Sequence, residues 1–107
     1  MNNYNLSDNE ISIIEKCLKV SVEGDYFDDN EFSTIIGLSR DEINNIYNTW
    51  PKINGDDKET FEAIKSCMLN LRGYPHGKKD ILYKDLDTDK ISLDALYEKV
   101  KNIINII

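Results

Sequence analysis

The stretch Glu31–Pro51 constrains the fold of this chain most, because it reads as a short helix, a tight turn and a second helix. Ser39 is followed three residues later by Glu42, which is the spacing of a capping box at the start of a helix. After this box comes an apolar stripe at i, i+3, i+4 and i+7, made of Ile43, Ile46, Tyr47 and Trp50. Pro51 prevents the second helix from continuing. The pattern therefore predicts a helix-turn-helix-like pair.

Three further segments have helical spacing. Ser7 and Glu10 form a second capping box, and the helix behind them is expected to end near Gly24. An acidic loop precedes a helix that Gly73 closes, and Ser92 is expected to cap the final helix. Residues 81–86 fit either one helical turn or a short strand, and their spacing does not decide between the two.

No run of residues alternates between apolar and polar types, so the fold class expected is all-α. We expect a compact bundle of about five helices in a single domain spanning residues 1–107. Asp28 or Asp29 is expected to cap the short helix, and Gly37 to end it in the left-handed conformation. The predicted core comprises Phe32, Ile36, Ile43, Ile46, Trp50, Phe61, Ile64, Leu71, Leu96 and Val100.

The net charge of -7 argues against nonspecific binding to nucleic acid and against docking on anionic lipid. It favours either a basic partner or a role in solubility alone. Cys17 and Cys67 lie in apolar helical patterns without a CxxC motif, so we expect buried free thiols, as in a reducing compartment. No segment has the features of a signal peptide or the ~20 apolar residues of a membrane span. We therefore expect a cytoplasmic protein with no membrane association.

No residue pattern indicates catalysis or a cofactor. The single histidine, His76, lies in a turn, where an exposed or helix-capping role is expected. Asp85–Asp89 copies the first positions of a calcium loop, but Lys90 replaces the required glycine and Leu96 replaces the bidentate glutamate. We therefore expect no catalytic residue, no metal site and no cofactor, and we expect that the chain is not an enzyme.

The helix-turn-helix outline raises DNA recognition as one hypothesis. The exposed positions after Arg40 include Asn44, Asn45 and Asn48, and asparagine can read adenine. Asp41 and Glu42 in the first turn of that helix would repel phosphate instead. A transcriptional or phage regulator is therefore the alternative function, and no nucleic-acid partner is expected under the preferred one.

Two acidic tracts that are mixed with aromatic residues, 23–31 and 56–62, suggest a protein interface. Aromatic anchors surrounded by charge suit an interface that is both tight and electrostatically steered. The candidate partner-binding residues are Tyr26, Asp28, Asp29 and Glu31, with Asp56, Asp57 and Tyr74 as a second patch. The alternative is that the aromatic residues belong to the core and that the carboxylates only cap helices.

The stretches FSTIIGLSRDEINNIYNTWP and LNLRGYPHGKKD are similar to a pattern found in small uncharacterised bacterial proteins. The shared residues are Phe32, Gly37, Leu38, Ser39, Arg40, Asp41, Glu42, Trp50 and Pro51, then Asn70, Leu71, Gly73, Tyr74, Pro75, His76 and Gly77. Such proteins are associated with immunity to secreted bacterial toxins, including those of contact-dependent inhibition and other polymorphic toxin systems. The resemblance implies an immunity protein that binds a cognate toxin, such as a nuclease, and occludes its active site. The implied partner is a basic toxin domain, because nucleases carry a basic substrate cleft that an acidic protein can occupy.

Overall fold

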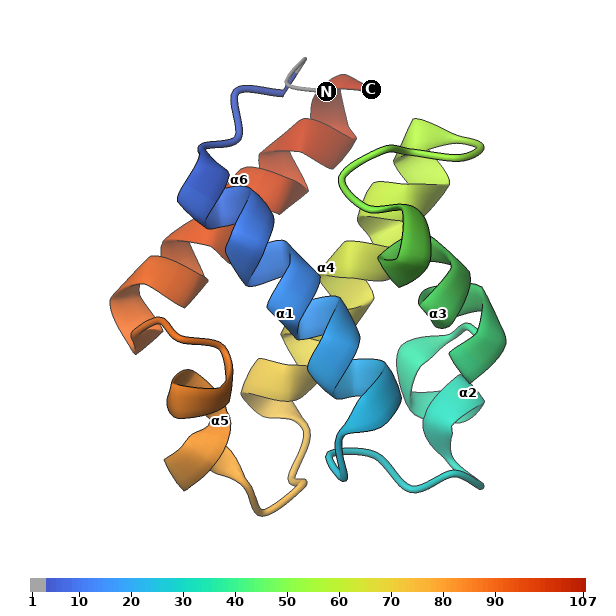
Figure 1. The fold of residues 1–107 in the computed structure, drawn as a ribbon, viewed down its shortest axis with the longest axis vertical. Helices are drawn as coiled ribbons and strands as arrows, with labels where there is room; N and C mark the ends of the chain where they lie inside the picture. The colour runs from blue at the N-terminus through green and yellow to red at the C-terminus, as the bar shows by residue number, and fades with distance from the viewer. Residues whose placement is uncertain (1–3) are drawn as a thin grey trace.

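Six helices and no strand make up residues 4–107, the part of the chain that the computed structural model describes (Figure 1). The helices are α1 (Asp8–Glu23), α2 (Phe32–Ile36), α3 (Arg40–Thr49), α4 (Asp57–Gly73), α5 (Lys79–Asp85) and α6 (Lys90–Ile106). The all-α prediction is confirmed, with one helix more than the five expected. The extra helix is α5, so residues 81–85 are helical rather than extended. Within the described range, none of the helices combines the length and the apolar character needed to cross a membrane.

Both serine capping boxes form as the sequence predicts. The Ser7 hydroxyl accepts a hydrogen bond from the Glu10 amide at 3.0 Å, and the Glu10 carboxylate accepts one from the Ser7 amide at 2.8 Å. Ser39 and Glu42 repeat this exchange at the start of α3. Each box satisfies amides that have no partner inside the helix, which is why these two helix starts could be located from sequence alone.

Two other capping predictions are wrong. The side chains before α2 form no capping hydrogen bond to that helix, and Asp28 accepts instead from the Asn30 amide at 2.9 Å, which shapes a local turn. The last helix begins at Lys90, not after Ser92, because Asp89 accepts from the Ser92 amide at 2.7 Å and so acts as the cap. The hydrogen bonds from Ser92 lower the pKa of Asp89. The predicted left-handed cap at Gly37 is confirmed, with φ of 89°.

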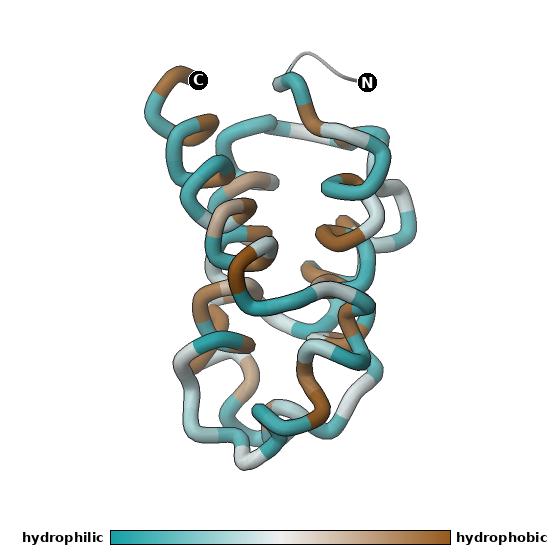
Figure 2. Tube along the Cα trace, turned by 90° about the vertical axis from the view of Figure 1, so that its left-hand side faces the viewer, coloured by the Kyte–Doolittle hydropathy of each residue, from teal (hydrophilic) through white to brown (hydrophobic). Residues whose placement is uncertain are grey.

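The core lies where α1 and α4 meet, with α6 packed against α4, α3 against α1 and α2 against α4 (Figure 1). Hydrophobic positions recur as bands among hydrophilic ones along the helices (Figure 2), as expected for helices that each bury one face. The two cysteines, Cys17 on α1 and Cys67 on α4, are buried free thiols as predicted. Burial raises the pKa of the Cys67 thiol to about 12.

All predicted core residues except Ile46 are buried. Ile46 lies on α3 and is only half-buried, although it still packs against the core. Its place in the apolar stripe predicted full burial, but the surface between α3 and α4 is left open beside it. The core also includes aromatic residues from the loop after α1, Tyr26 and Phe27.

We expect Leu71→Ala to lower the free energy of unfolding by ~2–5 kcal/mol, because the side chain is fully buried and leaves a cavity. Ile46→Ala should cost about 1 kcal/mol, since the half-exposed side chain gives up less contact. Urea unfolding of both variants measures the difference. Equal losses for the two would contradict the burial assigned to them.

Candidate protein-interaction surface

Arg40 begins α3, and its guanidinium group reaches across to the end of α1. Nη1 donates to the carbonyl oxygens of Ser21 at 3.2 Å and Val22 at 2.6 Å, and Nη2 donates to that of Phe27 at 2.8 Å. The guanidinium also lies 4.5 Å from the centre of the Phe32 ring. These partners belong to the last turn of α1, the loop after it and α2, so one side chain holds three segments together.

A surface concavity of about 770 Å³ lies beside this arginine, at the end of the bundle where α1 and α4 finish (Figure 1). Five exposed carboxylates line it, and we call this surface the acidic hollow: Glu23, Asp25, Asp28, Asp29 and Glu31. Arg40 is the single lysine or arginine in its lining, and both of its terminal nitrogens, Nη1 and Nη2, already donate to backbone carbonyls. The hollow therefore presents negative charge with little internal neutralisation.

Tyr26 lines the hollow as a buried residue. Its side chain is only 4% exposed, and its hydroxyl donates to Asp85 Oδ2 at 2.7 Å. Burial, together with this bond to Asp85, raises the pKa of the Tyr26 hydroxyl. Of the two interpretations given for Tyr26, a partner-binding residue or a core residue, its burial favours the core position.

Tyr74 joins the acidic hollow and not the second predicted patch. Its half-buried ring packs 5.8 Å from that of Phe27, and its hydroxyl donates to Glu31 Oε2 at 3.2 Å. Partial burial and Glu31 raise the pKa of the Tyr74 hydroxyl.

Asp56 and Asp57 lie at the opposite end of α4 from Tyr74. The helix has 17 residues, so the two ends are roughly 25 Å apart at 1.5 Å per residue. Asp56 caps the helix through the Glu59 amide, whereas Asp57 accepts a hydrogen bond from the Tyr4 hydroxyl. The two aspartates and Tyr74 therefore cannot form one compact patch, and the grouping predicted from sequence is wrong.

His76 lines the acidic hollow and also caps α4. Its Nδ1 accepts from the Lys78 amide at 3.0 Å, which leaves Nε2 to carry the proton and donate to the Leu71 carbonyl at 2.7 Å. The ring stands edge to face against Tyr26, with centroids 4.9 Å apart. Of the two roles expected for this residue, the capping role is the one observed. Sequence reasoning did not place it in the hollow, since only the fold brings the two turns together.

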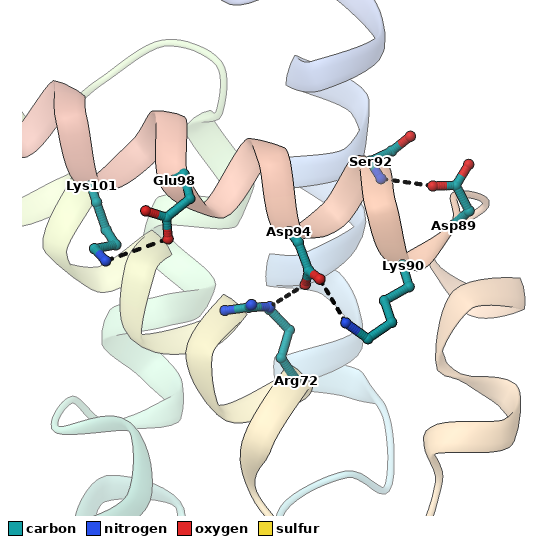
Figure 3. Close-up of polar contacts among 7 residues, drawn as sticks. All are labelled: Arg72, Asp89, Lys90, Ser92, Asp94, Glu98 and Lys101. Atoms are coloured by element: carbon teal, nitrogen blue, oxygen red, sulfur yellow. Dashed lines mark hydrogen bonds and ion pairs between the residues drawn. The ribbon is translucent and has the colours of Figure 1, made fainter.

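Outside the hollow, the ion pairs of the described residues involve the carboxylates of Glu10, Asp87, Asp94 and Glu98. On α6, Asp94 accepts from Lys90 at 2.7 Å and from Arg72 at 2.9 Å, and these two cations lower the pKa of Asp94 (Figure 3). Lys101 pairs with Glu98 on the same helix. Among the five carboxylates of the acidic hollow, only Asp29 forms an ion pair within residues 4–107. Its Oδ1 lies 2.9 Å from Arg40 Nη2. Carboxylates that form no ion pair in the described range also lie outside the hollow, among them Glu15, Glu59 and Glu62. The hollow is distinguished by having five carboxylates around one concavity.

The three carboxylates of the calcium-like sequence Asp85–Asp89 serve separate structural purposes. Asp85 accepts from Tyr26, Asp87 pairs with Lys16 at 3.5 Å, and Asp89 caps α6. Among residues 4–107, no group of three or more histidine, cysteine or acidic side chains converges in a way that could hold a metal ion.

We expect Arg40→Met to lower the free energy of unfolding by roughly 2–4 kcal/mol, because it leaves three carbonyl oxygens without their charged donor. Asp29→Asn is the matched control. This substitution removes only the ion pair between Arg40 and Asp29, whose own side chain is 88% exposed. It should therefore lower the free energy of unfolding by less than about 1 kcal/mol. If the two variants were equally destabilised in urea unfolding, the carbonyl bonds would not be what holds α3 to α1.

No model of a known protein family, no curated protein and no solved structure matches this chain. The resemblance to small bacterial immunity proteins therefore stays a prediction, which rests on the motif residues alone. Several of these residues have clear structural roles here, since Ser39 caps α3, Arg40 holds α3 to α1 and His76 caps α4. A function for the chain has to be argued from its surface.

Proposed function

We propose that this chain is an immunity protein, which binds a basic bacterial toxin domain through the acidic hollow and occludes the toxin's active site. The observation that carries the proposal is the set of five exposed carboxylates around one concavity, four of them without an ion pair in the described part of the chain. A net charge of -7 adds a long-range field of the same sign. A basic surface is the natural complement of both.

The rigidity of the hollow supports a binding role. Its walls are fixed from within by Arg40 and by the bond between Tyr26 and Asp85. A preorganised surface loses less conformational entropy on association than a flexible acidic tail would. Tyr74 adds a half-buried aromatic ring at the rim, and aromatic residues are favoured in interfaces.

The carboxylates would act on a nuclease toxin by taking the place of phosphate groups. A nuclease cleft holds lysine and arginine side chains that neutralise the nucleic-acid backbone. Asp28, Asp29 and Glu31 offer such side chains negative oxygen atoms on a folded frame. A protein seated in the cleft in this way excludes the substrate without any chemical step, so the proposed role needs no catalytic residue or cofactor.

The alternative, a helix-turn-helix regulator, is suggested by the succession of α2, the turn at Gly37 and α3, but the charges on α3 oppose it. Arg40 lies at the start of α3, and its Nη1 and Nη2 atoms donate to backbone carbonyls of this chain. These two nitrogens are therefore not free to contact phosphate. Asp41 and Glu42 occupy the first turn of α3 as exposed side chains. They would face a DNA backbone with the wrong charge.

The proposal predicts that a toxin domain is encoded beside this gene, and it is tested by expressing that domain with and without this chain. We expect co-expression to restore growth and the two proteins to purify together as a complex. Continued growth arrest together with the absence of a complex would overturn the assignment.

We expect Asp28→Asn/Asp29→Asn to slow association with that toxin domain and to make the association rate less dependent on salt. The reason is that exposed rim charges act mainly by steering the encounter, so the dissociation rate should change little. Surface plasmon resonance at two salt concentrations separates the two rates. The control is Glu15→Gln/Glu98→Gln, which changes the net charge equally at exposed sites outside the hollow. An equal effect of the two double variants would mean that the hollow is not the binding surface.

Binding to random duplex DNA should be undetectable at physiological salt, because a protein with net charge -7 gains little from counterion release. A gel-shift titration checks this expectation. A submicromolar complex that is selective for one sequence would instead favour the regulator.

A further inference from the structure

A second concavity, of about 990 Å³, lies between α3 and α4 and is separate from the acidic hollow. We call it the α3–α4 groove. Glu42, Asn45 and Ile46 face it from α3 at the i, i+3, i+4 spacing of one helix face. Glu59, Glu62, Ala63 and Ser66 face it from α4 with the same periodicity. One row of side chains from each helix thus forms its walls.

One end of the α3–α4 groove is closed by α2. The Ser66 hydroxyl donates to the Ile36 carbonyl at 2.5 Å, and the Asn70 amide group donates to the Ile35 carbonyl at 3.2 Å. These bonds satisfy carbonyls at the end of α2 and fix it against α4. The groove therefore has a defined end wall, although no helix among residues 4–107 covers its length.

The floor of the α3–α4 groove is apolar and incompletely covered. Leu38 and Ile46 are both half-buried there, and Ala63 lies beneath them. Ile46 is the predicted core residue that the fold leaves open. Half-open aliphatic side chains next to a small residue form a shallow apolar seat, which is the usual receptor for one side chain of a docked helix.

The rim of the α3–α4 groove is acidic. Glu42, Asp56, Glu59 and Glu62 line it, opposed by Lys58 alone. The Glu42 carboxylate already accepts a hydrogen bond from the Ser39 amide, and the Asp56 carboxylate accepts one from the Glu59 amide. Glu59 and Glu62 form no ion pair with any residue from 4 to 107, and both are exposed.

We propose that the α3–α4 groove binds an amphipathic helical segment of a basic partner protein. An aliphatic side chain of the segment rests on Leu38 and Ile46, while lysine or arginine side chains on either side meet Glu59 and Glu62. Charge complementarity selects this occupant over a second copy of the chain, whose net charge of -7 would repel the acidic rim. The site is independent of the acidic hollow and does not depend on the immunity function.

The test is a nuclear magnetic resonance titration of the whole chain with a synthetic helical peptide. The peptide places two leucines at i and i+4 with lysines beside them, and a scrambled peptide of equal composition is the control. We expect saturable shifts centred on Leu38, Ile46 and Ala63 with the first peptide only. Shifts centred on the acidic hollow, shifts spread evenly over the surface, or equal binding of the scrambled peptide would each overturn the proposal.

Two variants of equal charge change make the titration decisive. We expect Glu59→Gln/Glu62→Gln to weaken binding of the leucine–lysine peptide by roughly 3–10-fold at low salt. The matched control, Glu15→Gln/Glu98→Gln, should leave the affinity within about twofold of the unmodified chain, because its residues are exposed and line neither concavity. Equal weakening by the two double variants would mean that only net charge attracts the peptide and would also overturn the proposal.

Discussion

The bonds from the Arg40 guanidinium group to the carbonyls of Ser21, Val22 and Phe27 are the interaction on which the rest of the structure depends. The last carbonyls of a helix have no partner within that helix, and here a side chain from α3 supplies one. The chain can leave α1 sharply because residue 24 is glycine, since a Cβ there would lie 2.6 Å from the Val20 carbonyl oxygen. Arg40 then holds the loop that follows in one position, and with it the walls of the acidic hollow.

Much of the fold could be predicted from sequence because its strongest signals are local. A capping box satisfies its amides within four residues, so Ser7 and Ser39 could be read without knowing what surrounds them. The same local reasoning gave the wrong cap for α6. Asp89 and Ser92 are both residue types that cap helices well, and only the observed hydrogen bond shows that Asp89 is the cap. Ile46 shows the limit of periodicity, which identifies the apolar face of a helix but not whether another helix covers it.

The candidate site could be predicted only in part, because it is assembled from the ends of distant helices. The acidic tract was visible as a run of charges, and its exposed members Asp28, Asp29 and Glu31 do share one concavity. That Tyr74 bonds to Glu31 depends on where α4 ends relative to α1, which no local pattern encodes. Arg40 could be located in the sequence at the start of the second helix of the pair. Only the folded structure shows that its guanidinium donates to a backbone carbonyl of α1.

The described part of the chain starts and finishes at the same end of the bundle (Figure 1), where Lys99 of α6 donates to the Asn5 carbonyl at 2.6 Å and pairs with Glu10. The acidic hollow lies at the other end, beyond the last turns of α1 and α4. A tether joined at residue 4 or at residue 107 would consequently leave from the end of the bundle opposite the acidic hollow. The chain could be displayed on a bead, or joined to another domain, with its charged face pointing outward and unobstructed.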